Sequence, residues 1–173
     1  MSCVSRGSGS SCATQTTVSR RFPFVAQSTT IRAAQAGDSE AVRALIGEYV
    51  DSLGLDISFQ GVETELGDPL GFYEVVLLAK DGCVALRRID DTTCEMKRLY
   101  VRPNARGTGL GRRLAEALIV EARTRGYSRV LLDTLPTMAP AQTLYRSLGF
   151  RDTEPYRHNP VPGASFLELE IQL

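Results

Sequence analysis

The chain lacks the features that mark membrane-spanning, fibrous and nucleic-acid-binding proteins. No apolar run approaches the roughly 18 residues that a bilayer-spanning helix needs, and no low-complexity repeat occurs. Lysine and arginine together number 20, as do aspartate and glutamate, so the formal net charge is zero. A nucleic-acid partner would favour a clustered basic excess instead. We therefore expect neither a nucleic-acid partner nor a membrane partner.

Cysteine is scarce and widely spaced. The four cysteines are Cys3, Cys12, Cys83 and Cys94, and they form no CxxC pair and no metal-ligand spacing. In a hairpin that turns near Asp91, Cys83 falls opposite Leu99. Cys94 then falls opposite Arg88, so the two thiols do not face each other. We predict no structural disulfide and no metal site.

Acidic residues are absent from the first 37 positions, which contain four arginines among many serines and threonines. This composition is typical of an organelle transit peptide, although a disordered tail or a start codon placed too far upstream explains it equally well. No apolar core follows Arg20 and Arg21, which argues against a secretory signal. We expect an extension over residues 1–27 and one domain over residues 28–173. The expected location is cytoplasmic, or the mitochondrial or plastid matrix if the extension is a transit peptide.

The charged residues are unevenly distributed along the domain. Between Arg43 and Lys80 there is no basic residue, whereas seven acidic residues occur: Glu48, Asp51, Asp56, Glu63, Glu65, Asp68 and Glu74. From Lys97 to Arg125 the balance reverses, with eight basic residues and two acidic ones. The basic stretch suits an anion and the acidic stretch suits a cation, although solvation of exposed surface explains the acidic stretch equally well.

Hydrophobic periodicity and turn signals predict an α/β domain with a mixed sheet. Expected strands cover 29–33, 73–79, 83–89, 94–101, 130–132, 150–153 and 166–173, and expected helices cover about 39–53, 109–125 and 139–148. Asp38 offers an N-cap for the first helix, and Asp81-Gly82 signals a tight hairpin. The apolar run 130–132 lacks alternation, which favours burial on both faces and parallel pairing with 94–101.

The segment from Leu99 to Leu114 is the most informative one for function, because it contains a strand, a glycine loop and the start of a helix. Glycines at 107, 109 and 111 allow the backbone to approach a ligand closely. The N–H groups of the first helical turn form a partly positive cluster, which the arginines at 102, 106, 112 and 113 reinforce. The pattern predicts a site for a pyrophosphate-bearing cofactor.

One interpretation of this loop is a dinucleotide-binding fold, with Asp133 as the acidic residue that follows the next strand. Three observations disfavour it. Position 112, where the third glycine should stand, is an arginine, and five residues separate the strand from the first glycine. Only 40 residues remain after Asp133, too few for the rest of such a fold.

Three motifs favour another interpretation. The loop reads Arg106-Gly107-Thr108-Gly109-Leu110-Gly111, its lead-in Leu-Tyr-Val-x-Pro-x-x-Arg-Gly begins at Leu99, and Ala-x-x-Leu-Tyr-x-x-x-Gly-Phe runs from Ala141 to Phe150. With the order of elements, these motifs resemble the GNAT acetyltransferase superfamily over residues 29–173. Within it, segments 94–101 and 159–163 look like those of a bacterial-type group whose acceptors are mostly unassigned.

The resemblance implies a GNAT-type acyl-CoA N-acyltransferase fold, a mixed and mostly antiparallel sheet flanked by helices, with acetyl-CoA as acetyl donor. Backbone N–H groups of the glycine loop would hold the pyrophosphate, and arginines beside it would reach the phosphates. The strand before the loop would pair with the pantetheine arm and place a backbone donor near the acetyl carbonyl. The implied cofactor-binding residues are Leu99, Tyr100, Val101, Arg106, Gly107, Thr108, Gly109, Leu110, Gly111 and Arg112.

Two catalytic residues follow from the same resemblance. A lysine-like amine of pKa ~10.4 is almost wholly protonated at pH 7, so a base must take its proton. Glu95 is the candidate base or anchor of a water relay, and Tyr145 is the candidate acid that protonates the leaving thiolate. The alternatives are an ion-paired or solvated strand position for Glu95 and an aromatic packed on the sheet for Tyr145. Met138 replaces an asparagine common in relatives, which excludes a relay through that position.

The function implied is acetyl transfer to a primary amine by direct transfer in a ternary complex. The acidic stretch between Arg43 and Lys80 favours a small cationic molecule as the amine acceptor. The alternative is a regulatory module that binds acyl-CoA without catalysis. The oligomeric state stays open between a monomer and a homodimer.

Overall fold

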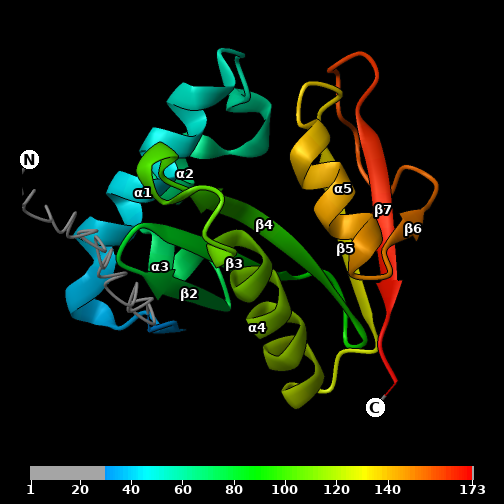
Figure 1. Cartoon of the computed structure of the whole chain (residues 1–173), viewed down its shortest axis with the longest axis horizontal. Coiled ribbons are helices and arrows are strands. Elements are labelled where there is room, and N and C mark those ends of the chain that lie inside the picture. Colours follow the sequence, from blue (N-terminus) through cyan, green and yellow to red (C-terminus); the bar gives the residue numbers. More distant parts are fainter. Residues whose placement is uncertain (1–29, 173) are drawn as a thin grey trace, which may run out of the picture.

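The computed structural model describes residues 30–172 and shows one seven-stranded mixed sheet (Figure 1). The strand order is β1-β2-β3-β4-β5-β7-β6, and only the β4·β5 pair is parallel. The strands are β1 (Arg32–Ala33), β2 (Val75–Ala79), β3 (Gly82–Arg88), β4 (Thr93–Val101), β5 (Arg129–Thr134), β6 (Arg151–Asp152) and β7 (Ser165–Glu170). The predicted fold class is confirmed, including the parallel pairing across the helical crossover. The extension predicted over residues 1–27, with Cys3 and Cys12, lies outside the described residues.

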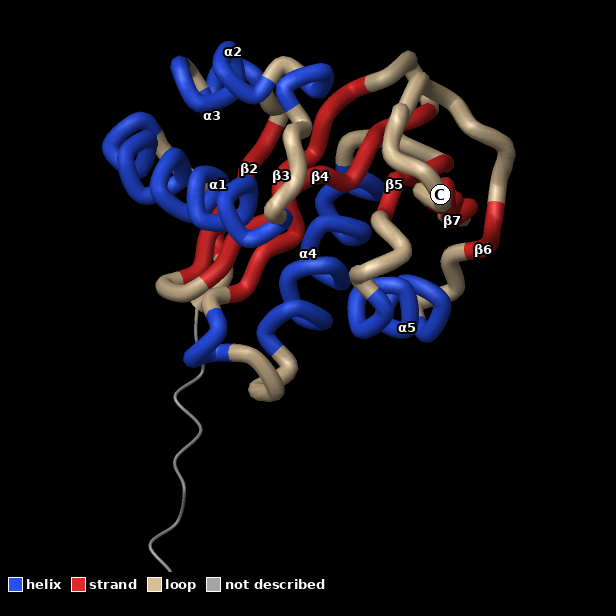
Figure 2. Tube along the Cα trace, turned by 90° about the horizontal axis from the view of Figure 1, so that it is seen from above, coloured by secondary structure: helices blue, strands red, loops and turns tan. Residues whose placement is uncertain are grey.

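Helices cover both faces of this sheet. They are α1 (Ser39–Leu53), α2 (Val62–Gly67), α3 (Pro69–Phe72), α4 (Leu110–Thr124) and α5 (Ala139–Ser147), with single 3₁₀ turns at Ala36–Asp38, Ser58–Gln60 and Pro103–Ala105. Figure 2 shows α1, α2 and α3 on one side of the strands and α4 and α5 on the other. Within the described range, no helix is both long and apolar enough to cross a bilayer.

Alternation along the strands divides the core into two layers. Val75 and Leu77 of β2 pack with Leu114 and the other apolar residues of α4, whereas Val76 packs with Leu45 and its neighbours on α1. Successive side chains of a strand point to opposite faces, so a strand covered on both sides is apolar throughout. The uninterrupted apolar sequence of β2 is therefore a consequence of its central place between two helical layers.

The predicted N-cap chemistry at Asp38 was wrong. Asp38 does precede α1, but its side chain makes no capping hydrogen bond to that helix. Its carboxylate instead accepts from the Gln35 N–H at 2.8 Å and pairs with Arg32 at 2.6 Å. The carboxylate is therefore used to anchor β1 to the turn before α1.

In the β3–β4 hairpin, the predicted partner of Cys83 was wrong by one residue, whereas the predicted partner of Cys94 was correct. Cys94 lies opposite Arg88 as expected, but Cys83 lies opposite Tyr100 because the register shifts between Cys83 and Ala85. Both thiols are free and buried, and burial raises the pKa of each to about 12. Both side chains therefore act as small apolar residues of the core, with unreactive thiols.

The register shift coincides with a β-bulge at Arg98. Arg98 has φ 54° and is the one non-glycine residue with positive φ in the described part of the chain, a conformation that costs an L-residue roughly 1–2 kcal/mol. Its buried guanidinium donates from Nε and Nη2 to the Glu65 carboxylate of α2, at 2.6 to 3.1 Å, and lies over the Tyr49 ring at 5.6 Å. Tyr73 donates to the same carboxylate at 2.5 Å. The strained backbone is thus held by a buried ion pair.

Beyond the start of β4, the two parallel strands separate. Only Thr93, Cys94 and Glu95 pair with β5, whereas β5 pairs with β7 over its whole length. Figure 1 shows β4 and β5 together at one end and apart at the end where α5 begins. The separation leaves the β5-facing edge of β4 unpaired between Met96 and Val101.

Gly82, at the start of β3, is required for close packing rather than for an unusual φ. A Cβ atom at this position would lie 2.5 Å from the Tyr100 carbonyl oxygen, which is main chain and cannot move away alone. Gly82 is paired with Ala79, so the hairpin turn consists of Lys80 and Asp81. The turn predicted from Asp81-Gly82 is confirmed, but Gly82 lies at the start of β3, where it allows close packing, and not within the turn itself.

We predict that Gly82→Ala lowers the free energy of unfolding by about 1–3 kcal/mol, because the added methyl group forces the β3 and β4 backbones apart. Urea titration with an unchanged m-value measures the loss. The control is Gly47→Ala within α1, where no atom lies within 4 Å of the added Cβ and alanine is the better helix former by up to about 1 kcal/mol. Equal effects of the two substitutions would contradict the prediction.

We predict that Glu65→Ala lowers the free energy of unfolding by about 3–5 kcal/mol, because it leaves the Arg98 guanidinium charged and buried without its partner. The matched control is Glu40→Ala, whose carboxylate also pairs with an arginine, Arg43, but whose side chain is 86% exposed. The control should change stability little. Comparable losses in the two variants would show that the buried pair does not hold the bulge.

Candidate active site

The glycine loop leaves a row of backbone donors at the start of α4. Gly107 and Gly109 have φ of 76° and 80°, which L side chains rarely adopt. Arg113 is the first residue of α4 whose N–H is bonded back to the loop, to the Gly109 carbonyl at 3.1 Å. The amides of residues 107–112 therefore have no main-chain acceptor within residues 30–172. This is the donor arrangement that suits an anionic group.

A large cavity of about 700 Å³ lies against this loop. One wall is the end of β4 and the loop, and the other is formed by α1 and the start of α5. It is lined by Tyr49, Ser52, Leu53, Leu99, Tyr100, Val101, Ala105, Arg106, Gly107, Gly109, Leu110, Gly111, Thr137, Met138, Pro140, Ala141 and Leu144. Leu99, Tyr100 and Val101 of the unpaired edge of β4 line this cavity, so an extended ligand arm can lie beside them.

Most of the predicted cofactor-binding residues line this large cavity. Eight of the ten do so, and the two that do not are Thr108 and Arg112. The Thr108 hydroxyl donates to the Ala105 carbonyl at 2.7 Å, within the loop. Arg112 donates to Ser147 Oγ of α5 at 2.6 Å and pairs with Glu116 at 3.4 Å. The Thr108 side chain therefore stabilises the loop itself, and the Arg112 side chain links α4 to α5.

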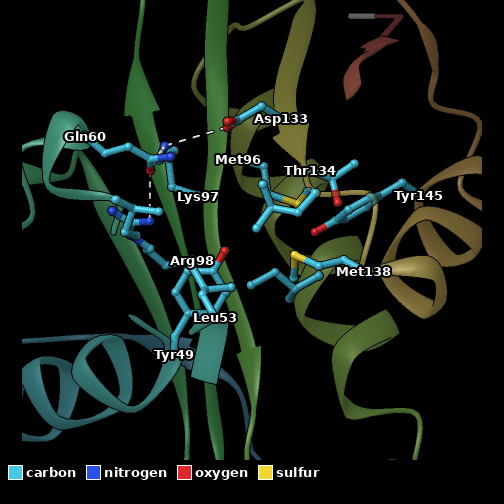
Figure 3. Close-up of a pocket in the computed structure, with 13 residues that line it drawn as sticks. Tyr49, Leu53, Gln60, Met96, Lys97, Arg98, Asp133, Thr134, Met138 and Tyr145 are labelled. Carbon is cyan, nitrogen blue, oxygen red and sulfur yellow. Dashed lines mark hydrogen bonds and ion pairs between the residues drawn. The ribbon is translucent and has the colours of Figure 1, made fainter. Parts of the chain in front are cut away.

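A small cavity of about 30 Å³ adjoins the large one, where β4 and β5 have separated. The two share Tyr49, Leu53, Leu99 and Met138 as lining residues. The other residues of the small cavity are Ile57, Gln60, Met96, Lys97, Arg98, Asp133, Thr134, Leu135 and Tyr145. Figure 3 shows these side chains converging from β4, β5, α1 and α5.

The predicted acid, Tyr145, lies in the small cavity. It comes from α5, its ring packs against Phe150 at 5.8 Å, and its residue is 7% exposed. Figure 3 shows its hydroxyl directed toward Met138 and the middle of the cavity. No described residue is hydrogen-bonded to this hydroxyl, and burial raises the pKa of Tyr145 well above its usual value. The hydroxyl therefore keeps its proton at neutral pH.

The predicted base, Glu95, lies outside both cavities. Its side chain is fully buried and its Oε2 pairs with Arg87 at 2.6 Å. Its Oε1 accepts from the Tyr156 hydroxyl at 2.8 Å and lies 3.4 Å from Arg157 Nε and 3.7 Å from Lys97 Nζ. Both oxygens are thus already engaged.

Two charged residues of the small cavity, Lys97 and Asp133, were missed by sequence reasoning. Lys97 Nζ lies 3.8 Å from Asp133 Oδ1, and Arg157 donates to both oxygens of Asp133 at 2.7 Å. Asp133 directly follows the apolar run 130–132 within β5, and Lys97 lies within β4 between Met96 and Arg98. A charge next to an apolar run is the signal that could have found Asp133.

The acidic stretch does not form a free acidic wall. Glu48 pairs with Arg102 at 2.7 Å, Glu65 pairs with Arg98, and Glu74 pairs with Arg125. Asp68 caps α3 through the Gly71 N–H. Four of the seven carboxylates of the stretch are therefore engaged within the protein, and the cationic acceptor expected from the stretch stays a prediction.

Comparison with known proteins identifies this arrangement. A model of the acetyltransferase (GNAT) family matches residues 58–150. An uncharacterized N-acetyltransferase of Schizosaccharomyces pombe is 42% identical over 145 residues, 78% of this chain and 89% of the relative. The N-acetylaspartate synthetase of Danio rerio is 35% identical over 135 residues, 74% of this chain but 46% of that protein.

A solved structure supports the same assignment and bears on the cofactor. The protein yncA of Salmonella typhimurium, solved with its cofactor acetyl-CoA, has a TM-score of 0.61 and 25% identity and covers 84% of this chain and 95% of its own. The donor row and the large cavity fit such a cofactor, whereas a dinucleotide-binding fold would have a mostly parallel sheet. The chain therefore belongs to the acetyltransferase (GNAT) family and is an acetyltransferase that uses acetyl-CoA.

Proposed function

We propose that this enzyme transfers the acetyl group of acetyl-CoA directly to a primary amine, with both substrates bound in one cleft. The observation that carries the proposal is the junction of the two cavities at Leu99. A cofactor held by the glycine loop and an acceptor in the small cavity meet there. An enzyme that used a covalent acetyl-enzyme intermediate would need a nucleophile at the junction, but the described cysteines, Cys83 and Cys94, line neither cavity.

In this proposal, the main chain does most of the cofactor binding. The amides of residues 107–112 bind the pyrophosphate, and the exposed Arg106 side chain lies at the rim of the same cavity. The unpaired edge of β4, from Leu99 to Val101, pairs with the pantetheine arm as an added strand would. Bound acetyl-CoA supplies an acetyl group activated as a thioester. A backbone N–H near Leu99 stabilises the charge that develops on the acetyl oxygen.

Tyr145 is proposed to act as the general acid. As the new carbon–nitrogen bond forms and the carbon–sulfur bond breaks, the sulfur leaves as a thiolate that needs a proton. The Tyr145 hydroxyl is available for this step because it keeps its proton and has no other hydrogen-bond partner among the described residues. Such a group typically contributes 10²–10⁴-fold to a rate.

Glu95 is proposed to act through other groups. Its two oxygens are engaged by Arg87 and Tyr156, and its side chain lines neither cavity. These contacts favour Glu95 as the anchor of a proton relay over Glu95 as a base in direct contact with the amine.

A nitrogen acceptor is also supported by the relative from Danio rerio, whose name, N-acetylaspartate synthetase, states an N-acetyl product.

We predict that Tyr145→Phe lowers kcat at least tenfold with little change in the KM for acetyl-CoA, because only the proton donor is removed. The measurement is thiol release from acetyl-CoA with a panel of polyamines, amino acids, aminoglycosides and peptide amines. The matched control is Tyr127→Phe, which removes a hydroxyl bonded to Glu74 away from both cavities.

The Tyr145→Phe assay separates the alternatives. An unchanged kcat would assign Tyr145 to packing alone. A wild-type protein that binds acetyl-CoA but releases no thiol with any amine would favour the regulatory module that binds acyl-CoA without catalysis.

We predict that Gly109→Ala weakens acetyl-CoA binding at least several-fold, because an alanine at φ 80° is strained and the loop relaxes by turning its amides away. Isothermal titration calorimetry measures the dissociation constant. The control is Gly54→Ala, since Gly54 also has a positive φ, 61°, and open space around it but ends α1. Both variants should lose similar stability, and equal affinities for acetyl-CoA would refute the loop as its binding site.

A further inference from the structure

The small cavity adjoins a cluster of charges in which carboxylates and cations are paired. Its carboxylates are Glu65, Glu95 and Asp133, and its cations are Lys97, Arg98, Arg157 and the partly exposed Arg87, whose side chain is 32% exposed. These groups come from α2, three strands and the segment before β7. The three carboxylates are therefore balanced by three inner cations, and Arg87 pairs with Glu95 from the side of the solvent.

Every carboxylate oxygen in this cluster already has a partner. Glu65 accepts from Arg98 and Tyr73. Glu95 accepts from Tyr156 on one oxygen and pairs with Arg87 on the other. Asp133 accepts from Arg157 on both oxygens and from Asn159 Nδ2 at 2.7 Å. An ammonium group that entered the cavity would compete with Lys97 and Arg157 for carboxylates that already have cationic partners.

Lys97, in contrast, retains donor capacity. An ammonium group has three N–H donors, and Lys97 Nζ makes one hydrogen bond, to Gln60 Oε1 at 3.0 Å. Its distances to Glu95 and Asp133, 3.7 and 3.8 Å, suit ion pairs but are too long for hydrogen bonds. The side chain is 5% exposed and lines the cavity. Burial lowers the pKa of Lys97 to about 8, so it remains mostly protonated at neutral pH.

We propose that Lys97 binds a carboxylate of the acceptor, so that the amines this enzyme acetylates are amino acids rather than polyamines. The proposal rests on the proposed function, since it names the acceptor of the same site. Lys97 precedes Leu99 by two residues on β4, and both residues line the small cavity. The amine and the carboxylate of one small molecule can therefore occupy the junction and the Lys97 end together.

The size of the small cavity supports the same substrate class. Its volume of about 30 Å³ leaves room for a small polar group beside Lys97 and excludes a sugar ring or an aromatic side chain at that point. A bound carboxylate would accept the hydrogen bonds that Lys97 has left to donate. A polyamine would place a second cation beside Lys97, which is unfavourable at short range in a buried site.

The test compares each of the twenty amino acids and β-alanine with its carboxamide, since the amide keeps the shape and removes the charge. Thiol release from acetyl-CoA gives kcat/KM for each member of a pair. We expect the wild-type enzyme to favour the acid at least tenfold in its best pair. Lys97→Met should lose that preference mainly through a higher KM for the acid, and Lys97→Arg should keep it.

A merely structural role for Lys97 would lower the rates with acid and amide equally. Lys97→Gln is the second charge-removing variant, because it keeps a donor for Gln60 if the methionine variant does not fold. Acetylation of amines with no preference for the acid would overturn the inference and leave the proposed function standing. Absence of thiol release with every amine would instead overturn the proposed function.

If no amine causes thiol release, calorimetric titration of the wild-type protein saturated with CoA still tests whether Lys97 binds a carboxylate. We expect heat of binding from the amino acids at concentrations where their carboxamides give none. Equal binding of acid and amide, or binding of neither, would overturn the role assigned to Lys97.

Discussion

The buried ion pair between Arg98 and Glu65 is the interaction on which the site depends. It holds Arg98 at a positive φ, and this bulge shifts the register of β4 against β3. The same contact fixes α2 over the strand, because Glu65 belongs to that helix. From Met96 onward, on both sides of the bulge, β4 has no pairing with β5, and the two cavities lie along this part of the strand. A buried pair gives little net stability of its own, so its value here lies in the geometry that it enforces.

The two cavities recognise their ligands by different means. The large cavity presents backbone donors and an unpaired strand edge, which depend on main-chain conformation and on the glycines at 107 and 109. The small cavity presents buried side chains that are joined in ion pairs. Lys97 lines this cavity and retains N–H donors that make no hydrogen bond. Side chains can change from one enzyme to another without disturbing the main chain, so acceptor choice can vary while cofactor binding stays the same.

The sequence predicted the fold and most residues that line the large cavity because their signals are local. The residues from Arg106 to Gly111 are contiguous, and the central strands β2 and β5 are marked by apolar runs. The acceptor side was not predictable, because Glu65 and Arg98 are 33 positions apart and Asp133 and Arg157 are 24 apart. Ion pairing across such separations also accounts for part of the acidic stretch, because Glu48 and Glu65 pair with Arg102 and Arg98 of the basic stretch. Glu95 was found by its place on a strand, but its partners Arg87 and Tyr156 became apparent only in the fold.

The short ladder between β4 and β5 has a mechanical consequence. The sheet consists of two parts, β1 to β4 and β5 to β7, joined along the strands by three residue pairs at one end. Leu99 stands on the first part, and Tyr145 is carried by α5 beside the second. A small rotation about that short ladder acts as a lever, moving the far ends of the two parts much more than the paired residues themselves. Such a rotation would change the spacing between Leu99 and Tyr145, which both line the small cavity.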